Sequence, residues 1–167
     1  MLNPRHFRHL VVAPVLRRID LWSQAAENLV VGTAIQESGL RLLRQGLKRL
    51  DDAGGVALGL YQMEPATHDD IWTNYIQHRR PLSTLVERLL ARDGLLVEQL
   101  VWNLAYATAM CRVHYKRVPA ALPAAADVDG LSQYWKAHYN TPAGRGSAAA
   151  WASAYREHGS ESEGIIR

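Results

Sequence analysis

Apolar residues recur at three- and four-residue steps along most of the chain, a spacing that predicts helices. The clearest early pattern covers residues 23–38, and Gly39 follows it as a helix stop. One stripe of this predicted helix carries six residues at helical spacing: Ala26, Leu29, Val30, Thr33, Ala34 and Glu37. The pattern therefore puts a carboxylate, that of Glu37, in the last turn and on the side that faces the core.

Further segments with helical spacing follow one another, with breaks at proline, glycine or polar clusters. The predicted helices cover residues 4–22 with an interruption near Pro14, 64–78, 81–92, 95–118, 127–139 and 147–158. The pattern over residues 95–118 is the longest, and we expect it to form the central buried helix. Residues 40–62 lack a clean period and contain a turn cluster at 51–55, which favours a small β-hairpin or an irregular lobe.

The expected fold class is therefore mostly α, a compact helical domain with a small lobe around residues 40–62. A chain of 167 residues suits one domain with one core, which we place over residues 1–167. Within this domain we expect residues 1–22 to form an N-terminal helical extension and residues 159–167 to form a flexible polar tail.

Charge and composition narrow the class of partner only slightly. The net charge of +3 and the pI of about 9.2 favour a polyanionic partner such as nucleic acid, anionic lipid or bacterial cell wall. Because no run of five Lys or Arg residues is present, we expect no nucleic-acid patch. Five Trp and seven Tyr residues suit stacking on carbohydrate, although most of them are expected in a helical core.

The cysteine and histidine residues predict neither a disulfide nor a metal site. The single cysteine, Cys111, lies in a helical pattern and is expected to be a buried thiol. No His or Cys pair has convincing zinc-ligand spacing, so we expect no metal and no cofactor. No segment approaches the roughly 20 apolar residues of a membrane span. The short apolar stretch 10–14 does not form a signal peptide.

Glu37 is the strongest candidate for chemistry. Burial and the negative end of the helix dipole both disfavour its charged form, and both would raise its pKa. A general acid that cleaves a sugar bond needs a carboxyl that stays protonated near neutral pH. The glycine-bounded turn Gly59–Gln62 supplies an amide suited to an N-acetyl group or a sugar hydroxyl.

Three short motifs resemble those of the soluble lytic transglycosylase family in the lysozyme-like superfamily. Gln36-Glu37-Ser38 matches the family's Gln-Glu-Ser, and Gly59-Leu60-Tyr61-Gln62 with Pro65 and Thr67 is similar to its Gly-Leu-Met-Gln-x-Met-Pro-x-Thr. Tyr139-Asn140 is similar to the end of its Ala-Tyr-Asn motif. The resemblance covers roughly residues 25–145, in the family's order.

The resemblance implies a lysozyme-like fold and an activity on peptidoglycan glycan strands. Glu37 would be the acid/base that cleaves the β-1,4 bond between N-acetylmuramic acid and N-acetylglucosamine. Ser38, Asn140 and the turn residues Gly59, Leu60, Tyr61 and Gln62 would line the sugar site. The Tyr139 hydroxyl would hold the catalytic carboxyl. The chain departs from the family at Tyr61 and at Glu64, whose place before a helix favours N-terminal capping.

Several alternatives stay open. If Asp51 or Asp52 reaches the cleft and activates water, the enzyme would be a hydrolytic lysozyme; otherwise the 6-hydroxyl of the substrate would form a 1,6-anhydro product.

The small size and missing export signal predict a phage or prophage protein, made in the bacterial cytoplasm, associated with the virion and acting on the periplasm or cell wall. A structural virion or assembly protein on the same fold, in contact with other virion proteins, is the non-enzymatic alternative. A helical nucleic-acid-binding protein would need a basic helix face, which the sequence does not provide.

Overall fold

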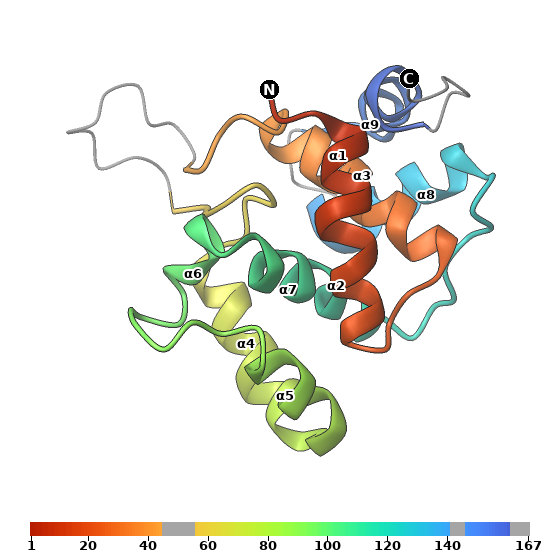
Figure 1. The fold of residues 1–167 in the computed structure, drawn as a ribbon. Helices are drawn as coiled ribbons and strands as arrows, with labels where there is room; N and C mark the ends of the chain where they lie inside the picture. Colours follow the sequence, from red (N-terminus) through yellow and green to blue (C-terminus); the bar gives the residue numbers. More distant parts are fainter. Residues whose placement is uncertain (45–55, 141–145, 161–167) are drawn as a thin grey trace.

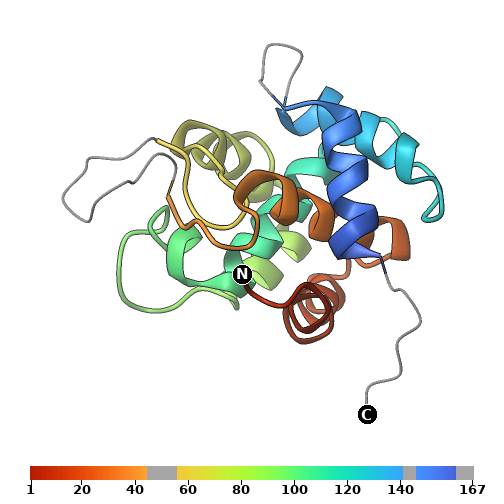
Figure 2. The ribbon, with the colours of Figure 1, turned by 90° about the horizontal axis from the view of Figure 1, so that it is seen from above.

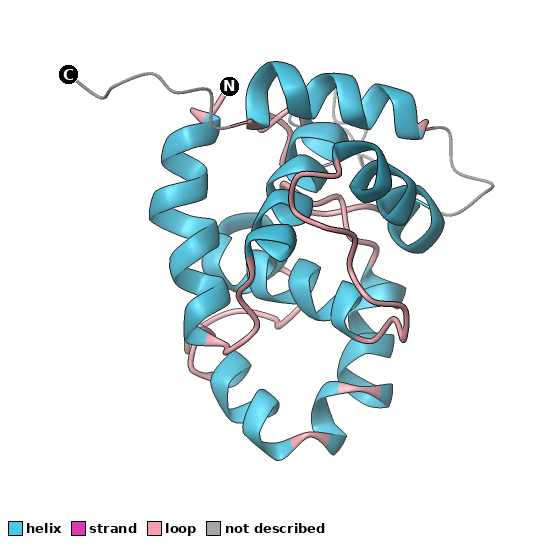
Figure 3. Ribbon diagram, turned by 90° about the vertical axis from the view of Figure 1, so that its right-hand side faces the viewer, coloured by secondary structure: helices cyan, strands magenta, loops and turns pink. Residues whose placement is uncertain are grey.

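The computed structural model describes residues 1–44, 56–140 and 146–160, and it is built from helices joined by loops (Figures 1 and 3). The mostly α fold class is confirmed. In chain order, the elements are α1 (Pro4–Phe7), η1 (Arg8–Val12), α2 (Ala13–Arg18), α3 (Gln24–Ser38), α4 (Pro65–Asn74), η2 (Ile76–His78), α5 (Arg80–Glu87), α6 (Gln99–Trp102), α7 (Leu104–Lys116), α8 (Val128–Trp135), η3 (Lys136–Asn140), α9 (Ala148–Ala154) and η4 (Tyr155–Gly159). Of these, η2 is a 3₁₀ turn, and η1, η3 and η4 are π turns.

The helix α3 runs through the middle of the fold and is buried on every side. Every residue from 26 to 35 is buried, and α1, α7, α8 and α9 pack on α3 from different directions (Figure 2). The Ser23 hydroxyl accepts a hydrogen bond from the amide of Ala26 at 3.1 Å, which fixes the first turn. Gly39 ends the helix in the left-handed conformation, with φ of 58°. The boundaries predicted for this helix are confirmed.

The prediction of one unbroken helix over residues 95–118 is wrong. Residues 99–102 form the short α6, and the chain then leaves the helical conformation at Asn103, with φ −95° and ψ 87°. The Asn103 side chain accepts from the amide of Tyr106 at 3.1 Å and donates to the carbonyl of Leu89 at 2.8 Å. This short polar side chain competes with the backbone for hydrogen bonds and starts a new helix, α7. Like α3, α7 is largely buried.

Other predicted helices end earlier than expected. The helix over 64–78 stops at Asn74 before the separate turn η2, and the helix over 81–92 stops at Glu87. Glu64 occupies the N-cap position of α4, as predicted, but its side chain makes no capping hydrogen bond.

The lobe expected around residues 40–62 contains no strand in its described parts, 40–44 and 56–62. Two isolated antiparallel bridges join Leu58 to Arg44 and to Met63. Asp51 and Asp52 lie outside the described residues, as do residues 141–145 and most of the predicted tail, 161–167.

The N-terminal segment is part of the core. Its apolar side chains are buried: Phe7, Val12, Val15, Leu16 and Ile19. The π turn η1 precedes Pro14, which has no backbone N–H to continue the regular pattern, and the helix then ends at Arg18. The predicted extension 1–22 therefore folds against α3 and α7.

Arg8 joins this segment to α3 and to η4 near the C-terminus. Its guanidinium donates to Glu27 at 2.8 Å, to Asn28 at 2.9 Å, to the Tyr155 hydroxyl at 2.9 Å and to the Gly159 carbonyl at 2.8 Å. Arg8 and Glu27 are both buried, so their ion pair is shielded from water. Removing either charge would leave the other buried without its partner.

We expect Arg8→Ala to lower the free energy of unfolding by about 3–5 kcal/mol, the usual cost of breaking a buried ion pair. Arg18→Ala is the matched control because Arg18 is an exposed arginine in the same segment, and it should change stability by less than about 0.5 kcal/mol. Denaturant titration measures both. A loss below about 1 kcal/mol for Arg8→Ala would contradict the role given to this network.

Candidate active site

Glu37 lies in the last turn of α3, where the buried helix reaches the edge of the core. Its carboxyl is partly buried, and Oε1 accepts a hydrogen bond from the indole Nε1 of Trp135 at 3.0 Å. The other oxygen, Oε2, makes no hydrogen bond to any residue that the structure describes. Glu37 thus combines a partly buried carboxyl with one oxygen held by Trp135 and one without a hydrogen bond to the described residues.

Burial raises the pKa of Glu37 to about 7, against an ordinary value of 4.5. The hydrogen bond from Trp135 acts in the opposite direction, because an N–H donor stabilises the carboxylate, and its effect is the smaller of the two. The direction agrees with the expectation from the sequence. A carboxyl with this pKa exists in both protonation states near neutral pH, as an acid/base catalyst must.

Trp135 is the residue that sequence reasoning missed. It ends α8 and is completely buried, so its indole has little freedom to move. Gly146 packs against the ring, and a Cβ added there would lie 2.5 Å from the Cη2 atom of Trp135 and 3.2 Å from the Asn140 Nδ2. The indole ring is therefore closely packed by Gly146, and Asn140 lies near it.

Tyr139 does not make the bond expected of it. Its hydroxyl donates to the backbone carbonyl of Tyr61 at 2.7 Å, and Trp135 bonds Glu37 instead. Burial raises the pKa of Tyr139 well above its usual range, and the nearby Cys111 and Glu37 raise it further. Tyr139 is thus close enough to feel the charge of Glu37, but it acts by fastening η3 to the turn at residues 59–62.

The turn Gly59–Gln62 is well formed and closely packed. Gly59 has φ of 71°, and a Cβ there would lie 1.9 Å from the carbonyl oxygen of Leu100, so only glycine fits. The Gln62 amide donates to the carbonyl of Gly59 at 2.8 Å. The turn therefore lies between α6 on one side and Tyr139 on the other.

Three of the side chains predicted to bind sugar are buried and contact other parts of the protein. Leu60 and Tyr61 are buried in the core, and the Tyr61 hydroxyl bonds Thr108 at 2.9 Å. Ser38 is also buried, and its hydroxyl donates to the Ala34 carbonyl at 2.9 Å. In this structure the side chains at these motif positions serve helix ending and packing, and their contact with sugar stays a prediction.

Gln62 and Asn140 are only partly buried. The Oδ1 atom of Asn140 accepts from the Lys136 ammonium at 2.8 Å, one turn back along η3. Two of the predicted binding residues lie near Glu37: Tyr139, whose pKa responds to the Glu37 charge, and Asn140, which is close to Trp135.

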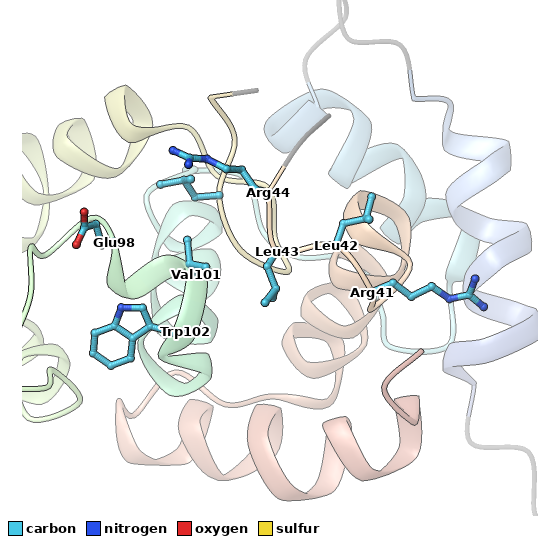
Figure 4. Close-up of a pocket in the computed structure, with 8 residues that line it drawn as sticks. Arg41, Leu42, Leu43, Arg44, Glu98, Val101 and Trp102 are labelled. Atoms are coloured by element: carbon cyan, nitrogen blue, oxygen red, sulfur yellow. The ribbon is translucent and has the colours of Figure 1, made fainter. Parts of the chain in front are cut away.

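A separate groove of about 600 Å³ lies between α6 and the segment that follows α3 (Figure 4). Its lining residues are Arg41, Leu42, Leu43, Arg44, Leu58, Glu98, Val101 and Trp102. Glu37 does not line this groove, which lies across the Gly59 turn from Tyr139. We place the candidate chemistry at Glu37 because it is the enclosed carboxyl with a pKa near neutrality, whereas the groove is lined mainly by apolar side chains.

Other polar clusters in the described part of the chain are structural. The Tyr106 hydroxyl accepts from Trp72 at 2.6 Å and bonds His68 at 2.7 Å. Burial raises the pKa of Tyr106 well above its usual value, so its hydroxyl stays protonated near neutral pH and is no nucleophile. Cys111 is a buried thiol, as predicted. Among the described residues, no group of three His, Cys, Asp or Glu side chains could hold a metal ion, and no helix is long and apolar enough to cross a membrane.

In comparisons with known proteins, the chain matches no family model, no curated protein and no solved structure.

The raised pKa of Glu37 predicts a pH-dependent cost to stability. Between pH 4.5 and about 7 the folded state binds more protons than the unfolded chain, so stability falls as pH rises through this window. Glu37→Gln is neutral at every pH and should be more stable than the wild type at pH 8, by roughly 2–3 kcal/mol. The difference should vanish near pH 4.5. Denaturant titrations of both proteins measure it, and a difference that does not change with pH would contradict the shifted pKa.

Proposed function

We propose that the protein is a peptidoglycan-cleaving glycosidase in which Glu37 is the general acid/base. The observation that carries the proposal is the state of this carboxyl, which is partly buried, has a pKa of about 7 and, among the described residues, is hydrogen-bonded through Oε1 alone. Such a group can donate a proton to the leaving oxygen of a sugar and take one back in the next step. In this proposal Asn140, which lies near the Trp135 indole, contacts the sugar next to the cleaved bond.

The proposed substrate is the β-1,4 bond between N-acetylmuramic acid and N-acetylglucosamine. This choice rests on the resemblance of residues 36–38 and 59–62 to motifs of lytic transglycosylases. A lysozyme-like arrangement of the helices, and an origin in a phage or prophage, belong to the same proposal.

The proposed reaction is that of a lytic transglycosylase. Among the described residues, no second carboxylate perturbs the pKa of Glu37. Glycosidases that use water as the nucleophile normally need such a second carboxylate close to the first. With one carboxyl at the bond, the substrate's own 6-hydroxyl is the nearest nucleophile.

The alternative is a virion structural or assembly protein without activity. The internal hydrogen bonds of the Ser38 and Tyr61 hydroxyls favour this alternative, because they leave fewer groups to bind sugar. Release of soluble fragments from purified sacculi separates the two functions.

Glu37→Gln should lower the rate of fragment release by about a hundredfold or more, the contribution expected of a general acid. The change keeps the shape of the side chain and removes its titrating proton. Glu64→Gln and Glu98→Gln are the controls, the first at an exposed helix start and the second in the groove, and both should retain most of the activity. Near-wild-type turnover by folded Glu37→Gln would sink the assignment.

Mass analysis of the fragments should find 1,6-anhydro ends. Alanine at Asp51, Asp52 or Glu64, introduced singly, should leave substantial activity, because none of them is required to activate water. Reducing ends, together with an inactive variant at one of these positions, would instead identify a two-carboxylate lysozyme.

A further inference from the structure

We infer that Trp135 is the positioning residue of the site: its indole N–H fixes Oε1 of Glu37 and assigns the exchangeable proton to Oε2. The catalytic consequence of this inference rests on the proposed function. The hydrogen bond from Trp135 to Glu37 is observed independently of that function. Trp135 thus takes the role that the sequence analysis gave to Tyr139, whose hydroxyl donates to the Tyr61 carbonyl instead.

The assignment of the proton follows from the chemistry of the indole group. Nε1–H of Trp can donate a hydrogen bond but cannot accept one. In a neutral carboxyl the carbonyl oxygen is the stronger acceptor, so the indole donor at 3.0 Å favours Oε1 as the carbonyl oxygen and Oε2 as the hydroxyl. Oε1 keeps its partner in both protonation states, and Oε2 is the oxygen that is available to a substrate.

The packing around Trp135 makes this arrangement rigid. The side chain is completely buried, and Gly146 approaches its ring too closely for any larger residue. A carboxyl that is held at one oxygen by a fixed donor keeps its orientation without an ion pair. The arrangement thus gives Glu37 a defined direction and leaves its raised pKa largely in place.

The chain offers a matched control in Trp151. This residue is also completely buried, against Gly32 of α3, but its indole nitrogen has no hydrogen-bond partner among the residues that the structure describes. Trp→Phe therefore removes the same atoms at both positions, and only at Trp135 does it remove a hydrogen bond to a carboxylate.

The experiment is a carbon-13 NMR titration of the Glu37 carboxyl in the wild type, Trp135→Phe and Trp151→Phe. We expect about 7 for the wild type and a value about one pH unit higher in Trp135→Phe, because a donor that stabilised the charged form is lost. Trp151→Phe should leave the pKa of Glu37 unchanged. An unchanged Glu37 pKa in folded Trp135→Phe, or an equal rise in both variants, would overturn the inference.

A second variant covers the case in which Trp135→Phe does not fold. Gly146→Ala adds a methyl group against the indole and should displace it, which raises the pKa of Glu37 in the same direction. No change in this pKa in folded Gly146→Ala would then overturn the inference. Sacculus cleavage by the wild type tests the proposed function separately: an inactive protein that shows the pKa rise keeps the positioning role and loses the enzymatic one.

Discussion

The structure depends on the burial of α3 on all sides. Its neighbours enclose it over ten consecutive residues, 26–35. The polar side chains near its two ends therefore lie inside the core or at its edge. The helix leaves the core only where Gly39 turns the chain with φ of 58°. The last-turn carboxylate of Glu37 is consequently held half in the core, which is what raises its pKa.

The two glutamates of α3 show how differently a fold can treat a carboxylate. Glu27 receives a guanidinium at one oxygen and the Trp22 indole at the other, at 2.8 and 2.6 Å, and so is fully bonded. Glu37 receives one indole and no cation in the described structure. The first arrangement stabilises the fold by joining the N-terminal segment to α3. The second costs stability near neutral pH, which is typical of a residue placed for chemistry.

The local parts of the site could be predicted from the sequence, and the long-range parts could not. Helical spacing with a following glycine is enough to place Glu37 in a buried last turn. Trp135 lies 98 residues further along the chain, and no local pattern indicates that its N–H meets that carboxyl. Side-chain hydrogen bonds also override periodicity: Tyr61 bonds Thr108 inside the core, and Asn103 bonds the backbone of Leu89 and Tyr106 at the helix break.

The most direct test of the account is the pH dependence of kcat/KM for sacculus cleavage between pH 5 and 9. A general acid must be protonated in the free enzyme, so kcat/KM should fall tenfold per pH unit above the pKa of Glu37, about 7. A rate that does not change through pH 7, or that already falls near pH 4.5, would show that Glu37 is not the acid that cleaves the bond.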